Sequence, residues 1–287
     1  MGCLCQGMDR IYKGKMKHLI CSDIDGTLLN VDRVLSEKTI QLFKKLKDKY
    51  PIVLISSRMP KSMRLLQNEL EITNHPLIAY NGNLIIDNDT ILYSESLSTD
   101  ISYAVSNYVK GTTIHLSLYH NDNWNVPQDD FWAKREMNNT RVKPKIQPIE
   151  QTLDQWQSKQ WGAHKIMCMG EENEIDVLYK KLLSNHANEL HAYRSKSTYI
   201  EISPIAKDKA SAILFLIQNK YPELSMENVI SFGDNYNDAT LLQQSGIGVA
   251  VANAKPEILK LASNITSTNI NDGVALFLNE MENNGQL

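Results

Sequence analysis

Two carboxylates stand two residues apart, at Asp23 and Asp25, directly after a run at residues 18–22 that has the length of a strand. Residues two apart on an extended chain project to one side, and open α/β sheets bind ligands at the carboxyl ends of their strands. One such carboxylate can attack phosphorus, while the other protonates the leaving oxygen and later activates water. A lone Asp-x-Asp is more often a solvated turn. The longer string Asp-Ile-Asp-Gly-Thr after a strand favours chemistry.

A second acidic pair follows another predicted strand, residues 229–232, in the string Gly-Asp-Asn-Tyr-Asn-Asp. A hard cation such as Mg²⁺ takes one or two carboxylates and keeps water and phosphate oxygens as its other ligands. Asp234 fits as a direct ligand and Asp238 as a residue that supports it. An N-capping turn is the alternative, because Asn and Asp are ordinary capping residues.

Two further positions suit an anionic substrate. Ser56 follows a predicted buried strand at residues 51–55, and its hydroxyl and N–H groups can donate to phosphate oxygens. Lys209 begins a predicted helix at residues 208–219, where a cation is unfavourable with the helix dipole unless an anion lies nearby. A loop serine and a solvated lysine are the alternatives.

The elements around these residues alternate between strand and helix. Helical patterns at residues 36–50 and 60–70 alternate with strands at 51–55 and 77–80, and the rhythm returns from residue 199. This alternation predicts a parallel sheet covered on both faces. Residues 85–198 have more alternating strands and contain all four tryptophans, which indicates an inserted domain. We therefore expect a core of residues 16–84 plus 199–287.

Composition restricts the other classes of function. The 287 residues carry a net charge of −3, which argues against nucleic acid or an anionic membrane as the main partner. No apolar run approaches the ~20 residues of a membrane span. The four cysteines show no framework spacing, as expected of free thiols in the cytoplasm.

Residues 1–15 are expected to form a flexible extension. Gly2, Cys3 and Cys5 resemble an acylation signal, but Gln6 stands where that signal needs Ser or Thr. A membrane-tethered form therefore remains an alternative, and no membrane partner is expected.

Taken in order, the Asp-x-Asp-Gly-Thr, Ser, Lys and Gly-Asp-x-x-Asn-Asp motifs resemble the haloacid dehalogenase (HAD) superfamily, specifically its Cof-type phosphatases. The resemblance runs from about residue 17 to residue 278. It implies an α/β fold with a Rossmann-like parallel-sheet core and an inserted α+β cap domain that closes on the substrate. Two departures are Ser57, where the motif commonly has Gly, and Ala210, where Gly commonly follows the lysine. Neither removes a catalytic atom.

The resemblance also implies roles. Asp23 would be the nucleophile and Asp25 the general acid and base. The residues expected to bind phosphate are Ser56, Ser57, Lys209 and Asn237. Those expected to hold or support the metal are Asp23, Asp25 (through its backbone carbonyl), Asp234 and Asp238. The candidates in the cap for contact with the leaving group are Trp124, Arg194 and Lys196, with the cap core as the alternative place for the tryptophan.

The function expected is a Mg²⁺-dependent phosphatase that forms an aspartyl-phosphate intermediate. Its substrate would be a small phosphorylated metabolite, such as a sugar phosphate or pyridoxal phosphate, and the enzyme would act as a monomer or homodimer. Two alternatives remain open: a phosphomutase of the same superfamily and a non-catalytic phosphate-binding protein.

Overall fold

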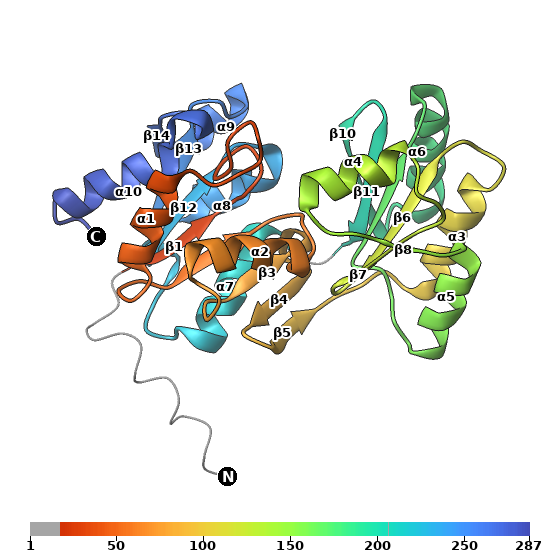
Figure 1. Cartoon of the computed structure of the whole chain (residues 1–287), viewed down its shortest axis with the longest axis horizontal. Helices are drawn as coiled ribbons and strands as arrows, with labels where there is room; N and C mark the ends of the chain where they lie inside the picture. The colour runs from red at the N-terminus through yellow and green to blue at the C-terminus, as the bar shows by residue number, and fades with distance from the viewer. Residues whose placement is uncertain (1–17, 206) are drawn as a thin grey trace, which may run out of the picture. The chain divides into compact units, whose positions relative to one another are not determined.

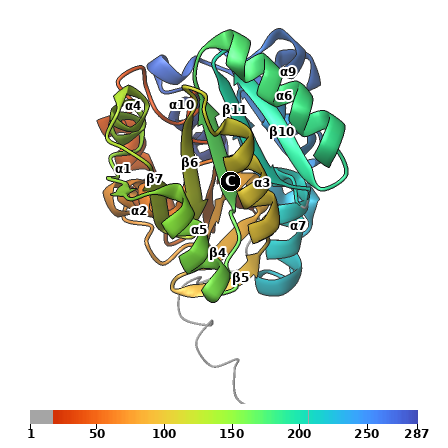
Figure 2. The same cartoon turned by 90° about the vertical axis from the view of Figure 1, so that its right-hand side faces the viewer.

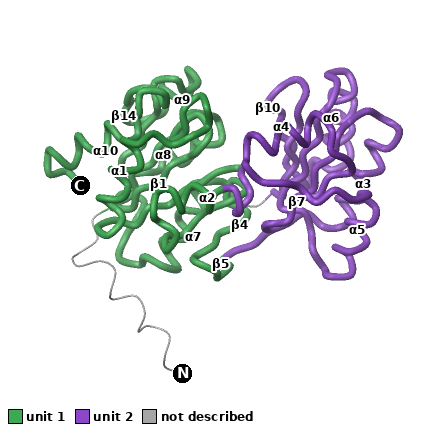
Figure 3. The backbone as a smooth tube through the Cα atoms, viewed as in Figure 1, with its two compact units in different colours: residues 1–57, 63–92, 207–287 green, residues 58–62, 93–206 purple. Residues whose placement is uncertain are grey.

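The computed structural model describes residues 18–205 and 207–287, which form two compact units (Figure 3). The first unit contains the described residues up to 57 together with 63–92 and 207–287, and the second contains residues 58–62 and 93–206. The predicted extension at residues 1–15, with its acylation-like cysteines, lies outside the described residues.

The first unit is built on a sheet of eight strands in the order β14-β13-β12-β1-β2-β3-β4-β5 (Figure 1). The six strands from β14 to β3 pair in parallel, and β4 returns antiparallel to β3. Every residue of β1, β2 and β12 is buried, as expected of strands covered on both faces. The strands are β1 (Leu19–Ser22), β2 (Ile52–Ile55), β3 (Leu77–Ala79), β4 (Leu84–Asp87), β5 (Thr90–Ser94), β12 (Val229–Gly233), β13 (Ile247–Val251) and β14 (Asn264–Thr266).

Helices pack beside this sheet in two groups (Figure 1). Helix α1 lies against α10, and α8 lies against both α7 and α9. Ser36 caps α1 by accepting from the Thr39 N–H, and Asp208 caps α7 in a capping box with Ser211. Both residues stand at the starts of helices that the sequence predicts, at residues 36–50 and 208–219. The helices are α1 (Glu37–Leu46), α2 (Pro60–Leu70), α7 (Lys209–Lys220), α8 (Ala239–Gln244), α9 (Pro256–Leu261) and α10 (Gly273–Asn283).

The second unit contains a six-stranded sheet in the order β10-β11-β9-β6-β7-β8. One apolar cluster joins α3, α5 and α6 to the inner strands of this sheet. Figure 2 shows these three helices in front of the strands. The strands are β6 (His115–His120), β7 (Asn123–Val126), β8 (Lys145–Ile146), β9 (Lys165–Met169), β10 (Leu190–Lys196) and β11 (Tyr199–Pro204). The helices are α3 (Thr99–Val109), α4 (Phe131–Thr140), α5 (Ile149–Ser158) and α6 (Glu172–His186).

The predicted fold class, an α/β fold with a mostly parallel central sheet, is confirmed. The predicted boundaries between the two parts need correction at both ends. Residues 84–94 extend the core sheet as β4 and β5, so the insertion begins near residue 93 and not at 85. Strand β11 was expected in the core, but it pairs with β10 and β9, and the first unit resumes at Lys207. Local sequence reveals a strand without revealing its partners.

Within residues 18–205 and 207–287, every helix is too short or too polar to span a lipid bilayer.

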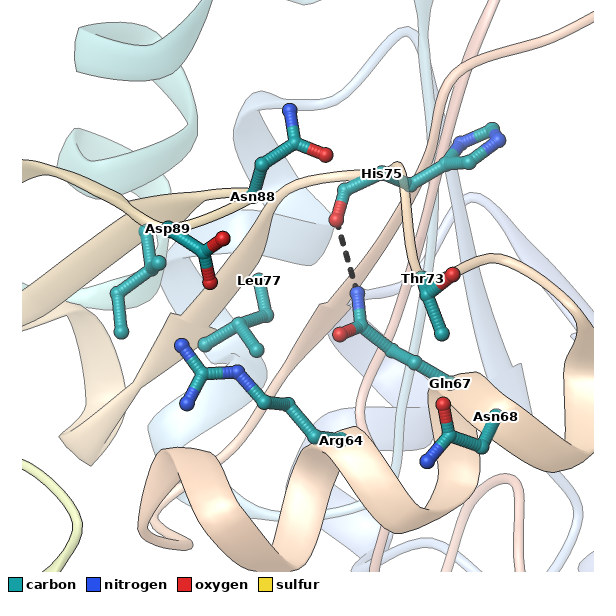
Figure 4. Close-up of a pocket in the computed structure, with 9 residues that line it drawn as sticks. Arg64, Gln67, Asn68, Thr73, His75, Leu77, Asn88 and Asp89 are labelled. Atoms are coloured by element: carbon teal, nitrogen blue, oxygen red, sulfur yellow. Dashed lines mark hydrogen bonds between the residues drawn. The ribbon is translucent and has the colours of Figure 1, made fainter.

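His75 connects β2 to the segment that follows α2. Its Nδ1 accepts a hydrogen bond from the Ile52 N–H at 2.9 Å, so that nitrogen carries no proton. Gln67 Nε2 donates to the His75 carbonyl oxygen at 2.9 Å, beside a pocket of about 310 Å³ (Figure 4). Because the side chain is only 3% exposed, burial lowers the pKa of His75 from 6.5 to about 4.

His75 should make the stability of the first unit depend on pH. The unfolded chain binds a proton near pH 6.5 and the folded chain only near pH 4, so stability falls as the pH drops through this window. The full loss is roughly 3 kcal/mol. His75→Gln, which keeps an acceptor for the Ile52 N–H, should flatten this dependence in urea unfolding at pH 7 and pH 5. His191→Gln, at an exposed histidine, serves as control. If the free energy of unfolding depended on pH equally in the two variants, His75 would not be the source of the dependence.

Candidate active site

Four neighbouring parallel strands end at polar residues, and three of these residues belong to the predicted motifs. Strand β12 leads to Asp234, β1 to Asp23, β2 to Ser56 and β3 to Asn81, and these strands are consecutive in the sheet. Carboxyl ends of parallel strands share one edge, so residues more than two hundred positions apart in sequence meet there. All these residues belong to the first unit.

Lys209, the first residue of α7, joins the strand ends electrostatically. Its Nζ lies 2.6 Å from Asp23 Oδ1 and 2.6 Å from Asp238 Oδ1, and the lysine side chain is 1% exposed. Burial acts to lower the pKa of Lys209, but the two carboxylates raise it above its ordinary value. The lysine is therefore a fixed cation between two buried anions.

Asp238 has both carboxylate oxygens engaged. Oδ1 accepts from Lys209, and Oδ2 accepts from the backbone N–H groups of Asp234 and Asn235, each at 3.0 Å. These bonds shape the turn after β12 and fix the position of Asp234. The contacts suit the predicted supporting role better than direct coordination of a metal.

The first motif also holds Asp234 in place. Thr27 Oγ1 donates to Asp234 Oδ1 at 2.8 Å, across 207 positions of sequence. Gly26 has a φ of +86°, and a Cβ there would lie 2.6 Å from Asp234 Oδ2. The glycine is needed both for its left-handed backbone and for the close approach of this carboxylate.

The acidic cluster fits a divalent cation. One oxygen each from Asp23, Asp234 and Asp238 lies within 4.8 Å of the others. Three carboxylates face one ammonium, which leaves an excess of two negative charges if all are ionised. Hard oxygen ligands are those that Mg²⁺ prefers.

The titration of these carboxylates reflects their crowding. Burial first, and then the neighbouring aspartates, raise the pKa of Asp23 above its ordinary range, while Lys209 opposes this. Burial and Asp238 raise the pKa of Asp234 to about 6, against the opposing hydrogen bond from Thr27. A cation bound here would favour the ionised forms of both groups.

Asp25 differs from Asp23 in its surroundings. Its side chain is 35% exposed, and its Oδ1 accepts from the Arg33 guanidinium at 2.6 Å. Asp23 is only 5% exposed. Two carboxylates two residues apart thus occupy different environments, as is typical of pairs that divide nucleophilic and acid–base roles.

The neighbouring strand ends supply polar groups beside this cluster. Ser56 is 1% exposed, and its carbonyl oxygen accepts from the Asn81 N–H at 2.9 Å. Asn237 Nδ2 donates to Asn81 Oδ1 at 3.1 Å, which ties the turn after β12 to the end of β3. Ser57 follows and is half-buried. Asn81 is not among the residues predicted for the site, and its left-handed φ of 57° is a signal that only the structure provides.

Comparisons with known proteins agree with this geometry. The family model of the haloacid dehalogenase-like hydrolases matches residues 20–278. The chain belongs to this family. A Haemophilus influenzae protein is 31% identical over 269 residues, covering 92% of this chain and 98% of its own. A Bacillus subtilis protein, 5-amino-6-(5-phospho-D-ribitylamino)uracil phosphatase YitU, is 27% identical over 276 residues, covering 92% and 97%.

A solved structure shares the fold. The crystal structure of a haloacid dehalogenase-like hydrolase from Bacteroides thetaiotaomicron has a TM-score of 0.84 at 23% identity, covering 92% of this chain and 99% of the other. This likeness concerns the fold. The family match and the two relatives confirm the resemblance inferred from the motifs and the prediction that this HAD protein is an enzyme of the phosphatase class.

The three predicted substrate contacts of the cap lie in the second unit, in different surroundings. Trp124 is 3% exposed, stacks on Tyr119 and donates from Nε1 to Ser117 Oγ, which places it in the interior. Arg194 pairs with Asp176 of α6 at 2.5 Å. Lys196 is exposed, with its Nζ 5.7 Å from the centre of the Tyr199 ring. Of the three residues, Trp124 is buried and Lys196 is exposed.

Lys209→Met should destabilise this HAD core, because it leaves Asp23 and Asp238 buried without their counter-ion. The expected loss in the free energy of unfolding is roughly 3–5 kcal/mol, measured by urea denaturation in metal-free buffer. Lys207→Met, two residues earlier, is the matched control. Equal stability of the two variants would show that the ammonium does not balance the cluster.

Proposed function

We propose that this HAD enzyme hydrolyses small phosphate monoesters through an aspartyl-phosphate on Asp23. The proposal rests on the position of the Asp23 carboxylate, which is buried at a strand end and lies 2.6 Å from the Lys209 ammonium. Ionised carboxylate, fixed ammonium and nearby carboxylates for a divalent ion are the components that phosphoryl transfer to an aspartate requires.

The first step forms a bond between an Asp23 carboxylate oxygen and phosphorus and breaks the bond from phosphorus to the leaving oxygen. Asp25 gives its proton to that oxygen. Lys209 and the hydroxyl of Ser56 stabilise the charge on the phosphoryl oxygens. The backbone N–H of Ser56, which the sequence also suggested as a donor to phosphate, donates instead to the Ile78 carbonyl oxygen at 3.0 Å. We further propose that Ser57 and Asn237 contribute to this phosphate site, from the ends of β2 and β12.

The second step releases inorganic phosphate. Asp25, now ionised, takes a proton from water, whose oxygen bonds to phosphorus as the bond to Asp23 breaks. Mg²⁺, held by Asp23, Asp234 and the Asp25 carbonyl, would neutralise charge on the phosphoryl group. Asp238 would act by orienting Asp234 and Lys209.

The proposed substrates are sugar phosphates or similar metabolites, including pyridoxal phosphate. The relative YitU is named for a ribityl phosphate, which supports a polyol-like leaving group. We also place the enzyme in the cytoplasm, because the two described cysteines, Cys21 and Cys168, are free and buried. We expect the enzyme to act as a monomer or a homodimer.

Substitution of each motif aspartate should have a different effect. Asp23→Asn should abolish release of phosphate from a panel of sugar phosphates and pyridoxal phosphate, because no acyl phosphate can form. Asp25→Asn should lower turnover by roughly 10²–10⁴-fold and allow phosphoenzyme to accumulate. Wild-type turnover by Asp23→Asn would contradict the mechanism.

The same substrate panel separates the two alternative functions. If the wild-type protein moved phosphate between sugar positions without releasing it, the protein would be a mutase. If it bound the substrates without turnover, it would be a phosphate-binding protein.

Gly26→Ala should raise the Mg²⁺ concentration needed for half-maximal activity. The new Cβ would lie only 2.6 Å from Asp234 Oδ2 and would push this carboxylate out of place. A shift of about tenfold corresponds to ~1.4 kcal/mol of lost metal binding. Gly111→Ala is the matched control, since Gly111 has a similar φ of +80° but no atom within 4 Å. Titration of dialysed enzyme with Mg²⁺ tests this, and an unchanged midpoint for Gly26→Ala would exclude Asp234 as a ligand.

A further inference from the structure

The turn at residues 30–34 presents one cation to the first motif. Arg33 Nη1 donates to Asp25 Oδ1 at 2.6 Å, and the arginine side chain is 45% exposed. We propose that Arg33 is a positioning residue for the Asp25 carboxylate, and this inference rests on the acid–base role of Asp25 proposed above.

This turn is built to hold Arg33 in an unusual conformation. Asn30 Oδ1 accepts from the N–H groups of Asp32 and Val34, at 3.0 Å and 3.2 Å. The Arg33 N–H donates to the Asn30 carbonyl oxygen at 3.0 Å, and Arg33 has a left-handed φ of 57°. A long side chain rarely adopts this backbone region. Such conformations persist where the surroundings impose them, and they gather at functional sites.

The backbone on the other side of Asp25 is clamped by the C-terminal part of the core. Asn253 Nδ2 donates to the Gly26 carbonyl oxygen at 2.8 Å, while its Oδ1 accepts from the Asn269 N–H at 2.8 Å. Asn269 Nδ2 in turn donates to the Leu29 carbonyl oxygen at 2.8 Å. These bonds hold the backbone at residues 26 and 29, and the bond from Arg33 restricts rotation of the Asp25 side chain.

The ion pair matters more for geometry than for stability. Exposed ion pairs contribute little to folding, whereas a charge-assisted bond to a guanidinium has a defined direction. A general acid must lie within hydrogen-bond reach of the leaving oxygen, and a displacement of about 1 Å can cost roughly 10²-fold in rate. Loss of Arg33 should therefore slow the steps in which Asp25 moves a proton and leave the fold intact.

Two matched substrates separate positioning of Asp25 from a structural effect. Phenyl phosphate and 4-nitrophenyl phosphate have nearly the same shape, but 4-nitrophenolate leaves without a proton and phenolate needs one. For Arg33→Met, kcat/KM with phenyl phosphate should fall about tenfold or more, and kcat/KM with 4-nitrophenyl phosphate less than about twofold. Arg33→Lys should restore most of the loss. Lys49→Met, another exposed cation on the same unit, is the control and should change neither value.

A double-mutant cycle with Asp25→Asn completes the test. If Arg33 acts through Asp25, adding Arg33→Met to Asp25→Asn should change kcat/KM no further. Three results for Arg33→Met would overturn the positioning role. They are an equal loss of kcat/KM on both substrates, the same loss of kcat/KM in the Asp25→Asn background, and a rise in kcat/KM. If Asp25→Asn itself shows no dependence on the leaving group, the proposed acid role fails instead. If it shows that dependence and Arg33→Met does not, only the inference about Arg33 fails.

Discussion

The buried ammonium of Lys209 is the interaction on which the site depends. Buried aspartates are tolerated only when they are paired and hydrogen-bonded, and Lys209 contacts both Asp23 and Asp238 at 2.6 Å. Its position follows from the start of α7, which Asp208 caps. Gly82 permits that start to approach the end of β3, since a Cβ there, at φ +117°, would lie 2.8 Å from the Asp208 carbonyl oxygen.

The charge that Lys209 leaves unbalanced defines the rest of the chemistry. The carboxylates of the cluster outnumber the ammonium, and the raised pKa values of Asp23 and Asp234 express the cost of holding these charges together. A divalent ion relieves that cost and offers ligand positions to a phosphate. Asp238 already accepts from Lys209 and from two backbone N–H groups, so it stabilises the arrangement and leaves Asp234 as the proposed ligand of such an ion.

The first motif separates two identical side chains by environment. Asp23 lies at the end of a buried strand, whereas Asp25 lies beyond it, partly exposed and paired with Arg33. A nucleophile benefits from a fixed, desolvated position, and an acid–base group needs access to the leaving oxygen and to water. The asparagines that clamp the loop keep this difference in place.

The sequence by itself determined the strand-end motifs, the helix starts near residues 36 and 208, and the α/β alternation with an inserted segment, because these depend on local residue patterns and spacing. Only the tertiary structure decided that β11 belongs to the inserted unit and that β4 and β5 belong to the core, since hydrogen-bond partners of a strand are set by distant segments. It also revealed the bonds from Thr27 to Asp234, from Asn237 to Asn81 and from Arg33 to Asp25. Even the bond from Arg33 to Asp25, whose residues are only eight positions apart, depends on the left-handed backbone of Arg33, which the sequence does not predict.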